Sequence, residues 1–293
     1  MKPARFDYCA AETVADAVGL LAELGADAAV LAGGMSLAPM LNLRLVRPRA
    51  VVDIGPIAAL RAVSLRGGTV VTGATVVQAD ALASPLLARE IPLLGLALPF
   101  VGHFQTRSRG TLGGSVAHAD PSAEIPLCLL TTGGAVVLRS RRRERRVPAR
   151  EFFRGALSTA RAPDELLVAL EWPRAPPHAG HAFEEIAQRH GDFAIAAAAC
   201  QVRLAADRET IEDLSVGLGG VEERPAAVDT QAFRGRAADA PLAAEVADRA
   251  ARSVDPIEDR AADAAYRRAL ANALVERVVT RAIADARAPR GEP

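Results

Sequence analysis

The chain has 293 residues, half of them hydrophobic, and its 35 basic residues balance 35 acidic residues. This length predicts two domains, and the neutral balance gives no electrostatic reason to expect nucleic acid or an anionic membrane as a partner. Because Lys2 is the only lysine, a GxxxxGK[ST] phosphate loop is excluded and a Schiff-base site for pyridoxal phosphate is disfavoured.

The three cysteines, Cys9, Cys128 and Cys200, are widely separated and form no CxxC pair. Because a [2Fe–2S] cluster usually needs four thiolates, we expect no cluster in this chain, and the spacing of Cys and His supports no metal site. We expect buried thiols in a reducing cytoplasm. The apolar runs are interrupted before the ~18 residues that a membrane span needs, so we expect neither a membrane span nor a cleaved targeting segment.

The first third of the chain alternates between helix-like and strand-like segments. Apolar residues at helical spacing predict a helix over 13–24, with Thr13 as its N-cap and Gly25 at its end. The Gly-rich and hydroxyl-rich segment 108–115 predicts a loop. The other predictions are strands over 28–32 and 50–54, a turn or helix over 37–43, a hairpin of 60–65 and 69–74, and helices over 76–83 and 85–98.

The rest of the chain contains a candidate domain boundary. Two short apolar segments, 126–130 and 135–138, precede a run from Arg139 to Arg146 that is rich in arginine. We expect this arginine-rich run to form a solvated hairpin edge rather than a site for nucleic acid or a partner protein. After a strand over 166–172, the breaker-rich stretch 173–180 predicts the boundary. Predicted strands over 182–187, 195–204 and 214–218 and helices over 243–252 and 261–286 then give an α+β second domain.

Two glycine loops supply the candidate binding residues. The first is Ala32-Gly33-Gly34-Met35-Ser36, and the second is Thr111-Leu112-Gly113-Gly114-Ser115. Glycines let backbone N–H groups approach an anion, and each loop ends in a hydroxyl donor. Asp120 and Glu124 follow the second loop as candidate acceptors for ribityl or ribose hydroxyls. A single loop of this kind is more often a plain turn, but two such loops together are suited to grip one diphosphate from two sides.

A Rossmann site is excluded, because adjacent glycines do not form the GxGxxG fingerprint. A hydrolase triad is not expected either. His118 and Asp120 lie close in sequence, but no serine or cysteine occupies a nucleophile motif such as GxSxG.

Four segments resemble a known family. The runs AGGMSLAPMLNLRLVRP (32–48) and RGTLGGSVAHADPSAEIP (109–126) resemble the two FAD-binding loops of molybdenum hydroxylase flavoprotein subunits. That family includes the medium subunit of carbon monoxide dehydrogenase and the flavin domain of xanthine dehydrogenase. The runs FEEIAQRHGDFAIAAAA (183–199) and VGLGGVEERP (216–225) are similar to parts of its C-terminal domain. The segments follow in the family's order over nearly the whole chain.

The resemblance implies a fold and a set of site residues. Residues 1–177 would form an FAD-binding domain of the PCMH or vanillyl-alcohol-oxidase type, built from two α/β subdomains, and residues 178–293 a C-terminal domain with an antiparallel sheet and helices. Residues 32–36 and 111–115 would contact the FAD pyrophosphate, and Glu124 would contact the cofactor as an acidic residue. Leu166 would touch the ring system or the adenine, and Phe193 would pack near the isoalloxazine.

One departure from the family concerns charge. A lysine often found near Glu184 or Glu185 is absent, which leaves Arg189 as the candidate to balance negative charge on the reduced flavin.

The resemblance also implies a function. The chain would be an oxidoreductase subunit in which FAD carries out the chemistry and no side chain is a catalytic acid or base. A large partner subunit would hold the molybdenum cofactor, and a small one would pass electrons from [2Fe–2S] clusters to FAD, in a dimer of heterotrimers. Two alternatives stay open, a stand-alone FAD-dependent oxidoreductase and a flavin-free assembly protein. Neither the substrate nor the electron acceptor follows from the sequence.

Overall fold

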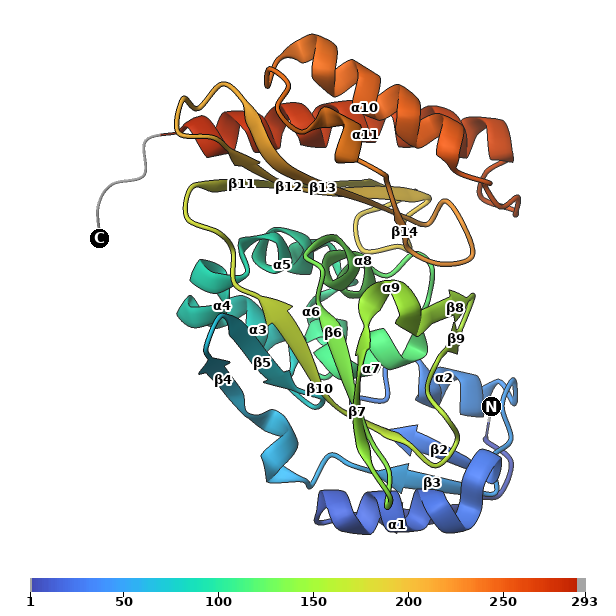
Figure 1. Ribbon diagram of the computed structural model, residues 1–293. Coiled ribbons are helices and arrows are strands. Elements are labelled where there is room, and N and C mark those ends of the chain that lie inside the picture. The colour runs from blue at the N-terminus through green and yellow to red at the C-terminus, as the bar shows by residue number, and fades with distance from the viewer. Residues whose placement is uncertain (1, 289–293) are drawn as a thin grey trace.

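The computed structural model describes residues 2–288, and three sheets follow one another along the molecule (Figure 1). A parallel three-stranded sheet lies at the N-terminal end, an antiparallel five-stranded sheet in the middle and an antiparallel four-stranded sheet at the C-terminal end. Residue 1 and residues 289–293, the outer ends of the two predicted domains, lie outside the described residues.

The first subdomain is a small sheet with strand order β1-β3-β2. Helix α1 packs against it and begins with a capping box, in which the Thr13 hydroxyl accepts from the Asp16 N–H and the Asp16 carboxylate accepts from the Thr13 N–H. The predicted helix over 13–24 and the strands over 28–32 and 50–54 are confirmed. The elements are β1 (Asp7–Ala10), α1 (Val14–Leu24), η1 (Gly25–Asp27), β2 (Ala28–Leu31), α2 (Leu37–Asn42), β3 (Ala50–Asp53) and η2 (Ala58–Arg61).

The second subdomain is a sheet with strand order β4-β5-β10-β6-β7 and a layer of short helices. Its central strand β10 also joins the two subdomains, because Leu166 lies in the core of the first and Trp172 in the core of the second. The strands are β4 (Val63–Arg66), β5 (Thr69–Gly73), β6 (Ala135–Arg139), β7 (Glu144–Pro148) and β10 (Leu166–Pro173), with a separate pair, β8 (Phe153–Gly155) and β9 (Ser158–Thr159). The helices are α3 (Gln78–Ala83), α4 (Pro85–Glu90), α5 (Pro92–Ala97), η3 (Leu98–Phe100), α6 (Phe104–Arg107), α7 (Leu112–His118), α8 (Glu124–Thr131) and α9 (Ala149–Phe152).

Three elements of this subdomain differ from their prediction. The helix predicted over 85–98 is interrupted at Ile91, since Pro92 cannot continue the hydrogen-bond ladder and begins α5 instead. The loop predicted over 108–115 is wrong from Leu112 onward, where α7 begins because the Thr111 hydroxyl accepts from the Gly114 N–H. The hairpin strand expected from residue 60 starts at Val63, after the 3₁₀ turn η2.

The arginine run from Arg139 to Arg146 forms the predicted hairpin edge, between β6 and β7. It is less free in solvent than expected. Five of its arginines form ion pairs with nearby glutamates, namely Arg139 with Glu144, Arg141 with Glu23, Arg143 and Arg145 with Glu165, and Arg146 with Glu171.

The C-terminal block is a sheet with strand order β11-β12-β13-β14 between two helical layers (Figure 1). Helices α10 and α11 cover one face, and the other face rests on α5 and α8 of the second subdomain. The α+β class with an antiparallel C-terminal sheet is confirmed. The elements are β11 (Ala179–Ile186), β12 (Ala196–Leu204), β13 (Ile211–Gly219), β14 (Ala226–Ala227), η4 (Gln231–Phe233), α10 (Ala240–Ser253) and α11 (Ala264–Arg287). Within residues 2–288, no helix has the length and apolar character that a membrane crossing requires.

Candidate functional site

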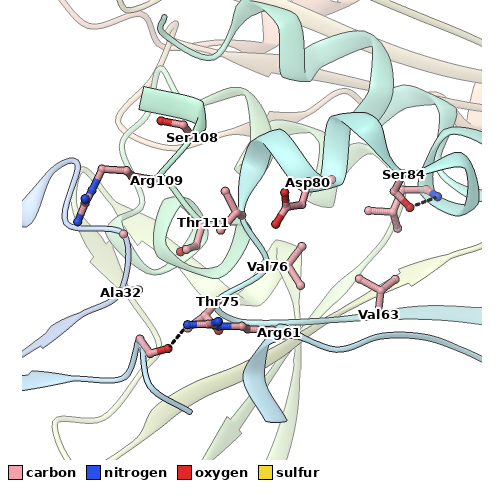
Figure 2. Close-up of a pocket in the computed structure, with 15 residues that line it drawn as sticks. Ala32, Arg61, Val63, Thr75, Val76, Asp80, Ser84, Ser108, Arg109 and Thr111 are labelled. Atoms are coloured by element: carbon pink, nitrogen blue, oxygen red, sulfur yellow. Dashed lines mark hydrogen bonds between the residues drawn. The ribbon is translucent and has the colours of Figure 1, made fainter. Parts of the chain in front are cut away.

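A cavity of about 470 Å³ lies where the two subdomains meet (Figure 2). Ala32 and Gly33 line it from the first glycine loop, and Arg109 and Thr111 line it from the start of the second. Its size falls within the range of ligand pockets, roughly 300–1,000 Å³. The two predicted loops therefore meet at one cavity, although they are far apart in sequence.

Gly33 makes the closest contact between the two loops. A Cβ atom built on Gly33 would lie 2.1 Å from the Arg109 carbonyl oxygen and 2.9 Å from the Gly110 Cα. Only a residue without a side chain fits between these backbones. The glycine is thus required by the approach of one loop to the other.

The first loop offers a row of free backbone donors. It leaves β2 at the carboxyl edge of the parallel sheet, where ligands bind in open α/β sheets. Within residues 2–288, the N–H groups of Gly33, Gly34, Met35 and Ser36 donate to no protein acceptor. Consecutive unpaired amides are a suitable cradle for a diphosphate.

The second loop is different, because its amides are already used inside the protein. The Leu112 N–H donates to Val76 O at 2.9 Å and the Gly113 N–H to Ala74 O at 3.1 Å. The Gly114 N–H donates to the Thr111 hydroxyl at 3.0 Å. This loop therefore fixes α7 against the core, and its contribution to the cavity comes from Thr111 and the preceding Arg109.

Two arginines that the sequence reasoning missed give the cavity positive charge. Arg61 and Arg109 both line it, and neither forms an ion pair with any residue in the range 2–288. Arg61 donates to Gly55 O at 2.7 Å, and Asp80 stands on the opposite wall (Figure 2). The position of Arg109, directly before the second loop, is a signal that the sequence contains, whereas nothing near Arg61 marks it.

The cavity fits the diphosphate of a flavin nucleotide on three grounds. Gly33 brings one of the free amides to its wall, and the other three follow in the same loop. Its two arginines have no carboxylate partner among the described residues, and both amides and guanidinium groups attract phosphate oxygens. The buried Thr75 hydroxyl, which also belongs to its wall, has no hydrogen-bond partner within residues 2–288. A ligand with several acceptor oxygens would satisfy these donors.

The remaining predicted site residues lie outside the lining of this cavity. The Leu112 side chain is fully buried in the second subdomain and Leu166 in the core of the first. Asp120 accepts from the Ser122 N–H, which orders the turn before α8. Phe193 is 73% exposed beside the C-terminal sheet.

The C-terminal block contacts the segment that follows the second loop. The Gly220 N–H donates to Pro121 O at 2.7 Å, so the glycine turn at 219–220 rests on the Asp120–Pro121 segment. The buried Arg267 of α11 holds this turn from behind, by donating to Gly220 O and to Ile195 O, each at 2.5 Å. Asp259 balances its charge at 2.7 Å.

Burial gives Glu124 and Glu185 unusual acidities. The pKa of Glu124 is raised to about 7, mainly because burial desolvates the carboxyl and also because Asp120 carries a negative charge nearby. A hydrogen bond from the backbone and the positive charge of Arg107 oppose the rise. Desolvation also raises the pKa of Glu185 to about 8, with the charge of Glu124 adding to the effect. Arg189, which we expected to balance charge here, is exposed to solvent.

Comparison with known proteins places the chain in a family. Residues 4–175 match the FAD binding domain in molybdopterin dehydrogenase, and residues 181–282 match the CO dehydrogenase flavoprotein C-terminal domain. The carbon monoxide dehydrogenase medium chain of Hydrogenophaga pseudoflava is 35% identical over 286 residues, which cover 96% of this chain and 98% of the relative. Caffeine dehydrogenase subunit beta of Pseudomonas sp. (strain CBB1) is 36% identical over 285 residues, 96% of each chain.

A solved structure agrees with these sequence matches. Carbon monoxide dehydrogenase from Hydrogenophaga pseudoflava, in a form that lacks the Mo-pyranopterin moiety of the molybdenum cofactor, contains a chain that matches with a TM-score of 0.94 at 35% identity. The match covers 97% of this chain and 99% of that chain. Fold, cavity and comparisons together define an FAD-binding oxidoreductase subunit. The chain belongs to the FAD-binding medium subunits of the molybdenum hydroxylases, and the resemblance seen in its sequence is confirmed.

Proposed function

We propose that this chain relays electrons through one bound FAD. It would take them from [2Fe–2S] clusters in a small partner subunit and pass them to an external acceptor, while a large partner subunit holds the molybdenum cofactor. The observation that carries the proposal is the cavity between the two loops, with its free amides and its unpaired arginines. Bound FAD supplies the redox chemistry, since a flavin accepts electrons singly or in pairs.

The residues of this chain would bind and orient the cofactor. The amides of residues 33–36 and the guanidinium groups of Arg61 and Arg109 would bind the pyrophosphate, with Thr111 and Ser115 as hydroxyl donors. Ala32, Leu112, Gly113 and Gly114 would shape the backbone around it. Asp120 and Glu124 would meet the ribityl or ring portion, Leu166 would support the ring system or adenine from the core, and Phe193 would lie near the isoalloxazine.

The domain division and the assembly belong to the same proposal. We assign residues 1–177 to the FAD-binding domain and residues 178–293 to the C-terminal domain. This division is supported by the core between the C-terminal sheet and helices α10 and α11, which contains only residues after 178. The complex would be a dimer of heterotrimers in the cytoplasm, a compartment that suits the three free cysteines. The relatives from the carbon monoxide and caffeine dehydrogenases are 35% and 36% identical to this chain, and this small difference supports selection of the substrate by another subunit.

Purification of the full chain tests the proposal. We expect a yellow protein with the two-banded flavin spectrum and one FAD per chain, which co-purifies with molybdenum- and iron-containing subunits when the three are expressed together. A chain that turns over a substrate without partners would favour the stand-alone oxidoreductase. A colourless chain that cannot be reconstituted with FAD would favour the assembly protein and refute the relay.

A further inference from the structure

Asp53 is the last residue of β3, the central strand of the parallel sheet. The first glycine loop leaves the sheet at the same edge, because Leu31, the last residue of β2, pairs with Asp53 in the strand register. The Ile54 N–H donates to Leu31 O at 2.9 Å, directly before that loop. The turn that follows Asp53 is therefore built beside the candidate phosphate cradle.

The Asp53 carboxylate holds this turn with both of its oxygens. Oδ1 accepts from the Gly55 N–H at 2.8 Å, which closes a turn of the Asx type. The approach is close, since a Cβ built on Gly55 would lie 3.0 Å from this oxygen. Oδ2 accepts from the Tyr8 hydroxyl of the neighbouring strand β1 at 2.5 Å. The carboxylate is thus fixed between the turn and β1.

The same turn restrains Arg61. Gly55 lines the cavity, and its carbonyl oxygen accepts from the Arg61 guanidinium at 2.7 Å (Figure 2). Arg61 ends the 3₁₀ turn η2 and is exposed, and among residues 2–288 Gly55 O is the acceptor that its guanidinium has. An unrestrained arginine has many rotamers, and a ligand that must fix one of them loses affinity to that entropy. The contact with Gly55 O therefore prepares Arg61 for an anion in the cavity.

We propose that Asp53 is a positioning residue for FAD. By holding the turn at Gly55, it keeps Arg61 directed at the cavity in which the pyrophosphate would bind. This role rests on the proposed function, because Arg61 meets a diphosphate only when FAD is bound. Asp53 itself lies outside the lining of the cavity, and its negative charge would repel a phosphate rather than attract it. Positioning and charge thus have opposite effects on FAD affinity, so a variant can distinguish them.

Titration of the FAD-free full chain with FAD, followed by flavin fluorescence, tests this role. Asp53→Ala releases the Gly55 N–H and should weaken FAD binding roughly 2- to 10-fold, the cost of immobilising one arginine side chain on binding. Asp53→Asn should bind FAD at least as tightly as the wild type, because its amide oxygen can still accept from Gly55. The matched control is Asp207→Ala, which removes an equivalent contact from the Glu209 N–H at 2.9 Å in the turn between β12 and β13. That variant should leave FAD affinity unchanged.

A double-mutant cycle with Arg61 separates positioning from a general loss of structure. Arg61→Gln should weaken FAD binding by itself, and the addition of Asp53→Ala should weaken it no further, because no guanidinium is left to position. Tyr8→Phe is a milder change at an exposed residue, since it removes the hydrogen bond to Asp53 Oδ2 alone. It should weaken FAD binding about twofold in the wild type and have no effect in Arg61→Gln. This variant tests the same contacts if Asp53→Ala does not fold.

Three results would overturn the positioning role while the proposed function stands. The first is an Asp53→Ala chain that binds FAD as tightly as the wild type or more tightly, which would leave Asp53 only its charge. The second is a loss in Asp53→Asn as large as that in Asp53→Ala. The third is a loss from Asp53→Ala or Tyr8→Phe that is equally large with and without Arg61, which would make the contacts merely structural. A wild-type chain that binds no FAD would instead refute the proposed function, and the positioning role with it.

Discussion

Replacing Gly33 by alanine tests the contact on which the binding site depends. The new Cβ would lie 2.1 Å from Arg109 O, whereas Cβ atoms do not approach other heavy atoms closer than 3.0 Å. The two backbones would have to separate by at least 0.9 Å, the difference between these distances. Overpacking of this kind costs ~1–3 kcal/mol, and here no flexible side chain can move aside. Since each 1.4 kcal/mol is about a tenfold change in affinity, we expect FAD to bind roughly 10- to 100-fold more weakly.

The assay is a titration of the FAD-free chain with FAD, followed by the quenching of flavin fluorescence, together with urea unfolding. Gly68→Ala is the matched control, because a Cβ on Gly68 meets nothing within 4 Å and its backbone needs no positive φ. That variant should bind FAD like the wild type. An unchanged FAD affinity in Gly33→Ala, with unfolding also unchanged, would show that the loops do not meet as described.

Three further predictions address the charges around the site. Arg109→Gln should weaken FAD binding about 10- to 100-fold by removing a charge-assisted hydrogen bond of ~1.5–3 kcal/mol. The control Arg142→Gln, in the exposed turn of the arginine hairpin, should leave FAD binding unchanged. Equal losses of affinity in the two variants would place Arg109 outside the site. Because the pKa of Glu124 is raised, the folded chain holds a proton that the unfolded chain releases between pH 4.5 and about 7. The free energy of unfolding should therefore fall as the pH rises through this range. The fall should be at most ~3 kcal/mol, at ~1.36 kcal/mol per pH unit. Urea unfolding of Glu124→Gln should show a flatter pH profile, and an identical slope would contradict the buried acid. Arg267→Met should lower the free energy of unfolding by roughly 1–3 kcal/mol for each of the two carbonyls left without a donor, and wild-type stability in urea would contradict their dependence on Arg267.

Much of the fold could be predicted from local patterns. The helix over 13–24 was recognisable because its cap, its apolar face and its terminal glycine are encoded within one short segment. The same holds for the hairpin at Gly67–Gly68 and the strands of the C-terminal sheet. Helix α7 was missed because its glycines disfavour a helix, while Thr111 and close packing on Ala74 stabilise it in the folded chain.

The site was only partly predictable for a similar reason. The two glycine loops were identified as candidates, and their approach at Gly33 agrees with the expectation that they meet at one ligand. The sequence reasoning did not show that the amides of the second loop are occupied or that Arg61 faces the cavity. Both facts depend on which distant backbone each group meets after folding.

By itself, the sequence determined the α+β class through periodicity and turn residues. It determined the family through the resemblance of four segments to known flavoprotein subunits, and it located both glycine loops. Only the tertiary structure decided which groups are left without partners. The free amides of residues 33–36, the unpaired Arg109 and the buried Oε2 atom of Glu185 became apparent once their neighbours were in place. The physical reason is that desolvation and pairing are properties of the three-dimensional surroundings. Two neighbouring glutamates therefore differ: Glu184 forms an ion pair with Arg277, whereas the Oε2 atom of Glu185 has no hydrogen-bond partner among the described residues.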